Sequence, residues 1–410
     1  MPSVLVVSSL DACDTGFQAI PRLLAAFRSK GWAVTFFVLR DTPQSTAVEA
    51  TNPVLSLPGI RVIRSSLPKS LFHGNPPPST LLHNAVWTGR MGIRLLQADL
   101  EPHDVVYSIE SVSAIGASLL GRKWQNPLRV HRFFGIADPS AALAMPRWRR
   151  WASSAALHQL GINARCDLLV MTDDGTMGDE VVRKHAPSNS KRLMFLPNGV
   201  DRPTCVRCRE RTARSASDPL RVLIISRLVG WKRVHLGLRG LAHAKSLGTP
   251  IVARVVGGGP SRLALEDEAD ALGLSSTVEF VGMLPQDDVW RQYEWADVLV
   301  STYDWSNVGN PLLEAFSMGL PVITVPNGGT ANWVQNGVNG ILCSLDEERI
   351  PYEVGESLRR LKTNCGLISQ LSRGAEQLAR ERIRPWEARL HDEVEEITRR
   401  LIDRRAPNRG

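Results

Sequence analysis

Short apolar runs alternate with stretches of helical periodicity along both halves of this 410-residue chain. In the first half the strand-like runs are 4–7, 33–39, 61–63, 104–108, 128–130 and 168–171, accompanied by helical patterns at 16–30, 111–120 and 176–184. A second series begins with the apolar run 220–226 and includes 251–256 and 322–325. Strands that alternate with helices pair in parallel, so this order predicts an α/β fold with helices on both faces of each sheet.

A polar stretch rich in Arg, Ser and Thr, residues 201–218, separates the two series. Such a stretch is typical of a domain boundary. We expect an N-terminal domain over 1–200, a C-terminal domain over 201–385, and a terminal helix and tail over 386–410. The terminal segment has one apolar face, made of residues at helical spacing: Trp386, Leu390, Val394 and Ile397.

A carboxylate, Glu314, lies about one turn inside a helix that is predicted to begin near Pro311. A helix N-terminus presents free N–H groups and a partial positive charge, which favour phosphate. A carboxylate one turn further in can accept hydrogen bonds from two sugar hydroxyls. A phosphate group together with two vicinal sugar hydroxyls is characteristic of a nucleotide. The alternative is a solvated carboxylate that stabilises the start of a helix.

Basic and glycine residues follow the strands of the second series. Arg227 and Lys232 come just after the run 220–226, and Gly257 and Gly258 end the run 251–256. Ligands of open α/β sheets bind at the carboxyl ends of strands, where two cations can neutralise a diphosphate. Glycines allow a tight turn and close approach of a ligand. The alternative is a pair of ordinary surface bases.

In this order the residues resemble the donor half of a GT-B glycosyltransferase, specifically the retaining glycosyltransferase family 4, also called glycosyl transferases group 1. The resemblance spans residues 198–387. Its segments are Asn198-Gly199-Val200-Asp201, Arg227, Lys232, Gly257-Gly258-Gly259-Pro260, Phe280-Val281-Gly282, Pro311-Leu312-Leu313-Glu314-Ala315, Gly319-Leu320-Pro321-Val322, Asn339-Gly340 and Trp386-Glu387.

The resemblance implies two Rossmann-like domains facing a central cleft, with the C-terminal helix crossing back to the N-terminal domain. It implies that the C-terminal domain binds a nucleotide sugar and the N-terminal domain binds the acceptor. Carried over residue by residue, the implied donor-binding residues are Glu314, Ser306, Val308, Gly309, Asn310, Gly257, Gly258 and Met283.

Two positions depart from the family's pattern. The family has a second Glu eight residues before Glu314, where this chain has Ser306, and Asn332 replaces another family Glu. A serine hydroxyl can donate or accept a hydrogen bond but carries no charge. Asp304 is a candidate substitute for the missing carboxylate. We therefore expect altered recognition of the donor sugar.

On the acceptor side, the resemblance implies roles for Gly16, in a phosphate or acceptor loop, and for His131, beneath the donor sugar. The alternative for Gly16 is a plain helix-start glycine. The alternatives for His131 are a partly buried structural histidine, or that Arg132 or Phe133 holds the equivalent place. The family's chemistry is transfer with retention, in which Arg227 and Lys232 stabilise the departing diphosphate. No metal or other cofactor is expected, because cationic side chains take that role.

The net charge of +8 favours anionic partners. No nucleic-acid motif accompanies it, so nucleic acid is not an expected partner.

Residues 147–151, Arg-Trp-Arg-Arg-Trp, suit either a solvated basic helix or a peripheral contact with an anionic membrane. Cys205 and Cys208 form a C-x-x-C pair without a second pair, which favours free thiols over a metal site. Neither a leader nor a membrane span is evident, and a cytoplasmic location is expected.

The leading functional hypothesis is transfer of a hexosyl group from a nucleotide-diphosphate sugar to an acceptor hydroxyl. UDP is favoured over GDP on the frequency of such donors alone. The acceptor is unknown, with lipid-linked acceptors favoured by the membrane interpretation, and the products expected are polysaccharides, glycolipids or glycosylated metabolites. Two other functions stay open: an idle nucleotide-sugar-binding subunit and a GT-B-type isomerase of sugar nucleotides.

Overall fold

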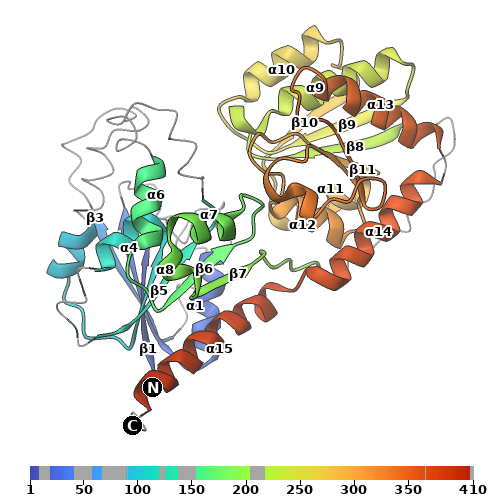
Figure 1. The fold of residues 1–410 in the computed structure, drawn as a ribbon. Helices are drawn as coiled ribbons and strands as arrows, with labels where there is room; N and C mark the ends of the chain where they lie inside the picture. Colours follow the sequence, from blue (N-terminus) through green and yellow to red (C-terminus); the bar gives the residue numbers. More distant parts are fainter. Residues whose placement is uncertain are drawn as a thin grey trace. The chain divides into compact units, whose positions relative to one another are not determined.

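The computed structural model describes residues 1–8, 19–40, 58–66, 89, 91–118, 120, 124, 126–136, 154–203, 218–364 and 366–406. The chain divides into two compact units. Unit 1 consists of 1–173, 177–197 and 386–410, and unit 2 consists of 174–176 and 198–385. Each unit is built on one parallel sheet flanked by helices (Figure 1), which confirms the predicted α/β class.

Among the described residues, the sheet of unit 1 has seven parallel strands in the order β3-β2-β1-β4-β5-β6-β7. The strand order reverses between β1 and β4. The strands are β1 (Ser3–Ser8), β2 (Ala33–Arg40), β3 (Ile60–Ser66), β4 (Val105–Ile109), β5 (Leu128–Phe133), β6 (Leu168–Thr172) and β7 (Leu193–Leu196). The helices of this unit include α1 (Ala19–Ser29), α4 (Glu110–Ser118), α6 (Ser154–Asn163), α7 (Gly178–His185) and α8 (Pro187–Ser190).

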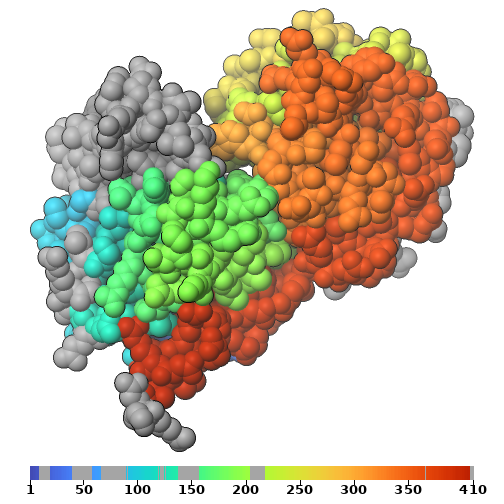
Figure 2. Space-filling model, in the orientation of Figure 1, coloured from blue at the N-terminus to red at the C-terminus, as the bar shows by residue number. Residues whose placement is uncertain are grey.

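The C-terminal helix α15 (Trp386–Arg405) belongs to unit 1 and lies beside α1 (Figure 1). Its predicted apolar face is buried against the sheet, with Leu401 extending it by one more turn. In the space-filling view α15 (red) borders green segments of the same unit, which belong to residues 160–173 and 177–197 (Figure 2). Arg404 reaches Asp167 there, at 2.9 Å. The terminal helix therefore completes the core of the N-terminal unit.

A buried ionic cluster ties α15 to the central strands of unit 1. Glu393 accepts hydrogen bonds from Tyr107 of β4, from Arg389 of α15 and, at 3.3 Å, from Arg132 of β5. All four side chains are buried. Burial, followed by repulsion from Arg132, holds the pKa of Arg389 well below its usual range. One carboxylate thus compensates two buried guanidinium groups.

In the described part of unit 2 the sheet has six parallel strands in the order β10-β9-β8-β11-β12-β13, and the order reverses between β8 and β11. The strands are β8 (Leu220–Ile225), β9 (Ile251–Val256), β10 (Val278–Gly282), β11 (Val298–Ser301), β12 (Val322–Thr324) and β13 (Gly340–Leu342). The helices are η6 (Gly230–Lys232), α9 (Val234–Ser246), α10 (Arg262–Ala271), α11 (Gln286–Trp295), α12 (Asn310–Ser317), η7 (Gly328–Asn332), α13 (Ile350–Thr363) and α14 (Leu367–Arg382).

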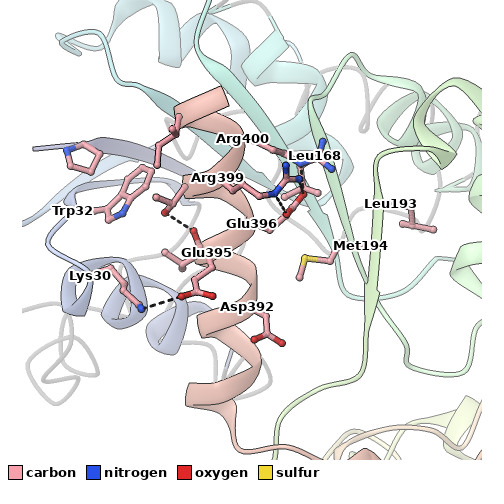
Figure 3. Close-up of a pocket in the computed structure, with 14 residues that line it drawn as sticks. Lys30, Trp32, Leu168, Leu193, Met194, Asp392, Glu395, Glu396, Arg399 and Arg400 are labelled. Atoms are coloured by element: carbon pink, nitrogen blue, oxygen red, sulfur yellow. Dashed lines mark hydrogen bonds and ion pairs between the residues drawn. The ribbon is translucent and has the colours of Figure 1, made fainter. Parts of the chain in front are cut away.

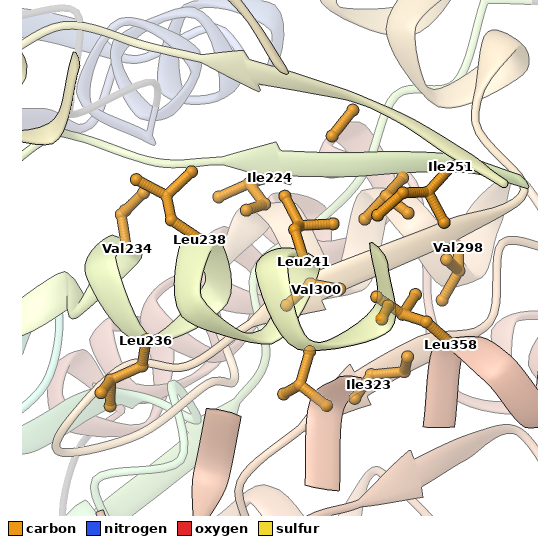
Figure 4. Packing of buried hydrophobic residues seen from close by; sticks show 14 of the residues in the cluster. Ile224, Val234, Leu236, Leu238, Leu241, Ile251, Val298, Val300, Ile323 and Leu358 are labelled. Atoms are coloured by element: carbon orange, nitrogen blue, oxygen red, sulfur yellow. The ribbon is translucent and has the colours of Figure 1, made fainter. Parts of the chain in front are cut away.

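Alternate residues of these strands feed two separate cores, because successive side chains of a strand point to opposite faces. Ile224 and Val300 pack under α9 and α13 on one face, with Leu238 and Leu241 from α9 (Figure 4). Leu299, next to Val300, packs on the other face with α11, α12 and α14. Helices on both faces leave the carboxyl edge of the sheet as the place for a ligand.

Two local predictions are wrong. The helix predicted from residue 176 begins only at Gly178: the Thr176 hydroxyl donates to Asp174 Oδ1 at 2.6 Å, and the N-cap is Met177, in the left-handed region at φ 58°. Strand β5 continues past residue 130 to Phe133, so His131 lies inside the strand. β5 pairs with β6 up to Phe133, with His131 opposite Leu169, and this long-range pairing extends the strand beyond residue 130.

Candidate functional site

Two basic residues follow β8, beside the reversal of strand order in unit 2. Lys232 ends η6, and its ammonium lies 3.3 Å from the centroid of the Tyr303 ring and 4.0 Å from that of Trp231. Burial and the nearby charge of Arg227 lower the pKa of Lys232 to about 7, against the attraction of Asp174. The side chain of Arg227 is exposed. The carboxyl end of β8 is therefore strongly electropositive when Lys232 is protonated.

The glycine turn after β9 is packed against the backbone that carries Arg227. A Cβ on Gly257 would lie 1.9 Å from the carbonyl oxygen of Ser226, and one on Gly259 would lie 2.4 Å from that of Leu228. Leu228 N–H donates to the Gly258 carbonyl at 2.9 Å. The glycines thus allow two loops of the site to touch. The space that a side chain would need at Gly257 and Gly259 is filled by backbone rather than by a ligand.

Helix α12 begins as predicted, with Gly309 as N-cap and Pro311 in the first turn. Glu314, one turn inside, is buried, and each of its carboxylate oxygens accepts a side-chain hydrogen bond. Tyr293 Oη donates at 2.8 Å and Gln286 Nε2 at 3.1 Å, both from α11. A carboxylate has about four acceptor sites, and these two partners fix the orientation of the Glu314 carboxylate.

The loop between β11 and α12 is organised by Asn307, a buried residue that sequence reasoning missed. Its Oδ1 accepts from Ser301 Oγ at 2.8 Å and from the Tyr303 N–H at 2.9 Å. Its Nδ2 donates to Asn327 Oδ1 at 2.8 Å, which links the loop to the segment after β12. The amide thereby satisfies backbone groups that a ligand-binding loop would otherwise bury unpaired.

Arg233 is the second residue that the sequence did not reveal. It adopts φ 44°, is buried, and donates to the carbonyls of Thr302 at 2.8 Å and Tyr303 at 2.9 Å. It also lies 3.2 Å from Asp304, the candidate substitute carboxylate. A non-glycine residue in the left-handed region is strained and persists where the surroundings hold it. Arg233 therefore ties the Lys232 turn to the loop after β11.

Ser306 faces the three-residue segment 174–176 of unit 2. Its hydroxyl donates to the Asp174 carbonyl at 2.8 Å and accepts from the Val308 N–H at 3.1 Å. A Cβ on Gly175 would lie 2.1 Å from this hydroxyl. Ser306 is thus a tightly packed link between two loops. Asn332, the other departure, is exposed on η7.

The implied donor residues all lie in unit 2, at the carboxyl ends of β8 to β11 or on α12. Val308 is buried beneath the loop, Asn310 accepts from Asn198 Nδ2 at 2.8 Å, and Met283 is 81% exposed after β10. The residues at this edge are Arg227, Lys232, Gly257, Gly258, Met283, Ser306, Val308, Gly309, Asn310 and Glu314.

The acceptor-side candidates belong to unit 1. His131 is 1% exposed, and burial lowers its pKa to about 4, so the ring is neutral at pH 7. Glu110, which sequence reasoning missed, follows β4 with φ 65°, and its carboxylate accepts from the Phe134 N–H at 2.9 Å. Other predicted features lie outside the described residues: Gly16, the basic run 147–151, Cys205 and Cys208.

Unit 1 also contains a groove of about 850 Å³ along α15 (Figure 3). Trp32 and Lys30 line one side, and Leu193 and Met194 line the other. Its charged groups are paired within the unit: Lys30 lies 3.8 Å from Glu395, and Arg400 lies 2.6 Å from Glu396. The groove therefore belongs to the packing of α15.

Doubly wound parallel sheets in two units, with the terminal helix in the first, are the architecture of the GT-B fold. Residues 209–349 match the model of the family described as glycosyl transferases group 1. A crystal structure of Anabaena HepE in complex with UDP and glucose has the same fold, with a TM-score of 0.67 and 16% identity over 96% of this chain and 98% of that one. The segment that matches the group 1 family lies within unit 2 and contains every residue of the candidate donor site.

Curated relatives match over about two thirds of their length. A glycogen synthase of Mycobacterium tuberculosis is 23% identical over 288 residues, which cover 62% of this chain and 68% of the relative. A GDP-mannose-dependent α-(1-6)-phosphatidylinositol monomannoside mannosyltransferase of Mycolicibacterium smegmatis is 29% identical over 253 residues, covering 55% and 66%. Among the described residues, no helix has both the length and the apolar character that crossing a bilayer requires.

Proposed function

We propose that this protein transfers a hexosyl group from a nucleotide-diphosphate sugar to an acceptor hydroxyl with retention of anomeric configuration. UDP is favoured over GDP as the nucleotide. The HepE complex with UDP supports this choice, and the GDP-mannose-dependent relative marks the competing one. Unit 2 would bind the donor and unit 1 the acceptor, and the product would be a polysaccharide, a glycolipid or a glycosylated metabolite.

The observation that carries the proposal is the pair Arg227 and Lys232 at the carboxyl end of β8, in the same unit as the N-terminus of α12. Negative charge grows on the departing diphosphate as the glycosidic bond breaks. Fixed cations and backbone N–H groups aimed at that charge stabilise the transition state. Cationic side chains would then serve where other glycosyltransferases use a metal ion, and the leaving phosphate itself would accept the proton of the acceptor.

Glu314 would orient the nucleotide rather than react. Its carboxylate is buried, fixed by Tyr293 and Gln286, and one turn from the helix N-terminus. That geometry suits two vicinal ribose hydroxyls. His131, neutral and buried, would act by packing or by a neutral hydrogen bond rather than as an acid.

A thermal-shift screen of UDP- and GDP-linked hexoses tests the proposal, because a ligand that binds the folded state raises the melting temperature. We expect stabilisation by at least one nucleotide sugar, followed by slow release of its hexose in the absence of acceptor. Binding without any release would favour the idle subunit, an alternative motivated by the missing Glu at position 306. Conversion of the donor to another sugar nucleotide would favour the isomerase.

A further inference from the structure

Two tryptophans form a stacked pair on the surface of unit 2. The ring centroids of Trp231 and Trp305 are 5.9 Å apart, with planes inclined by 20°. Trp305 is 61% exposed and Trp231 is 36% exposed. Single exposed apolar residues are ordinary on protein surfaces. Two large aromatic rings stacked at this small angle present a broader apolar surface than a single side chain, and we call this surface the platform.

The platform is held in place from below. The Asp304 N–H donates to the Trp231 carbonyl at 2.9 Å, and the Tyr303 ring packs edge-on against Trp231 at 6.1 Å. Tyr303 is itself anchored, since its hydroxyl donates to the Ile225 carbonyl at the end of β8, at 2.8 Å. A platform with fixed supports loses little conformational entropy when a ligand stacks on it.

The platform also lies next to the groups assigned to the donor. Trp231 directly precedes Lys232, whose ammonium is 4.0 Å from the Trp231 ring centroid. Trp305 directly precedes Ser306, whose hydroxyl is engaged with the Asp174 carbonyl. A diphosphate bound at Lys232 would therefore carry its hexose within reach of the tryptophans, where the family's carboxylate is missing.

We propose that the exposed face of Trp305 stacks against the hexose ring of the donor, with Trp231 as its support. This inference rests on the proposed function. The face of an aromatic ring is electron-rich, and the C–H groups on one face of a pyranose carry partial positive charge. Such stacking selects sugars by the arrangement of their axial hydroxyls, so Trp305 becomes a residue that determines donor specificity without charge.

The test separates the contribution of the sugar from that of the nucleotide. Affinities of wild type, Trp305→Ala and Trp305→Phe are measured by calorimetry for UDP, UDP-glucose, GDP and GDP-mannose. The quantity compared is the ratio of the Kd of the nucleotide to the Kd of its sugar conjugate. We expect Trp305→Ala to lower this ratio about fivefold to tenfold, with Kd for the bare nucleotide unchanged, and Trp305→Phe to retain most of it.

Tyr352→Ala is the matched control: this aromatic residue of unit 2 is 57% exposed and packs on His243 at 4.9 Å. It should leave every ratio unchanged. If Trp305→Ala leaves the ratio unchanged while wild type binds the donor, the stacking inference is overturned and the proposed function stands. If wild type binds none of the four compounds, the proposed function itself fails, and the inference with it.

Discussion

The Lys232 ammonium lies over the Tyr303 ring, 3.3 Å from its centroid. An aromatic face stabilises a cation without neutralising its charge, whereas a carboxylate would neutralise it. The same burial that brings the two side chains together lowers the pKa of Lys232 to about 7. Lys232 is therefore a cation whose charge depends on pH near neutrality and whose natural complement is an incoming anion.

Binding of UDP should weaken as pH rises above 7. Below its pKa of about 7, Lys232 carries its charge before the ligand arrives. Above that value the diphosphate has to draw a proton back, so Kd should rise by up to about tenfold per pH unit. Calorimetry between pH 7 and 9 should also detect proton uptake. Lys232→Arg, which stays protonated, should flatten the profile; a flat profile in wild type would contradict the prediction.

Removing either cation at the end of β8 should cripple transfer. Arg227→Ala or Lys232→Ala deletes a charge aimed at the leaving group, and we expect a loss of about 10² to 10³ in kcat. Initial rates with saturating donor measure the effect. Arg239→Ala, a change at an exposed arginine on α9 paired with Glu268, is the control and should be near wild type. Near-normal turnover in both site variants would refute the assignment.

Restoring the family's carboxylate at position 306 should destabilise unit 2. Ser306 packs so closely on Gly175 that a larger side chain must displace one of the two loops. We expect Ser306→Glu to lower the free energy of unfolding by about 1–3 kcal/mol. Ser306→Ala, which loses hydrogen bonds without crowding, should cost about 1 kcal/mol. Denaturant titration measures both. A Glu variant as stable as wild type with a new donor preference would show that the site admits the family's residue.

Neutralising Glu393 should be far more harmful than neutralising a carboxylate two residues away. Glu393→Gln leaves Arg132 and Arg389 facing each other in the core, and breaking a buried pair costs about 3–5 kcal/mol. Glu395→Gln changes an exposed carboxylate of the same helix and should cost less than about 1 kcal/mol. Urea unfolding followed by far-UV circular dichroism compares the two. Equal losses would mean that the cluster does not hold α15.

Local sequence patterns sufficed for the features that depend on one element at a time. The apolar runs located β1 to β6, β8, β9 and β12 but missed β7, β10, β11 and β13. Pro311 located the start of α12. The position of Lys232 after a strand placed it at the sheet edge, because parallel strands share their carboxyl edge. The GT-B fold was predicted from the resemblance, and the two doubly wound sheets confirm it.

What the sequence could not predict depends on contacts between distant residues. From the sequence alone, Arg233 resembles any surface arginine. Its role depends on the hydrogen bond that its guanidinium donates to the carbonyl of Thr302, 69 positions away. Tyr293 and Gln286 gain their role only when α11 lies beside α12. The stacking of Trp231 on Trp305 has the same origin. The glycines of the β9 turn were noticed, but their backbone neighbour at Ser226 comes from another loop.

Because α15 supplies core residues to unit 1, the strands of unit 1 are synthesised before unit 2 but their core is completed after it. The strands of unit 1 begin to emerge from the ribosome first, yet its core lacks Trp386, Leu390 and Val394 until α15 has been synthesised. Unit 2, apart from 174–176, is continuous from 198 to 385 and can close its own cores before that point. A nascent chain stalled before residue 386 would hold one finished sheet and one with a bare apolar face, which is the species that chaperones would have to shield.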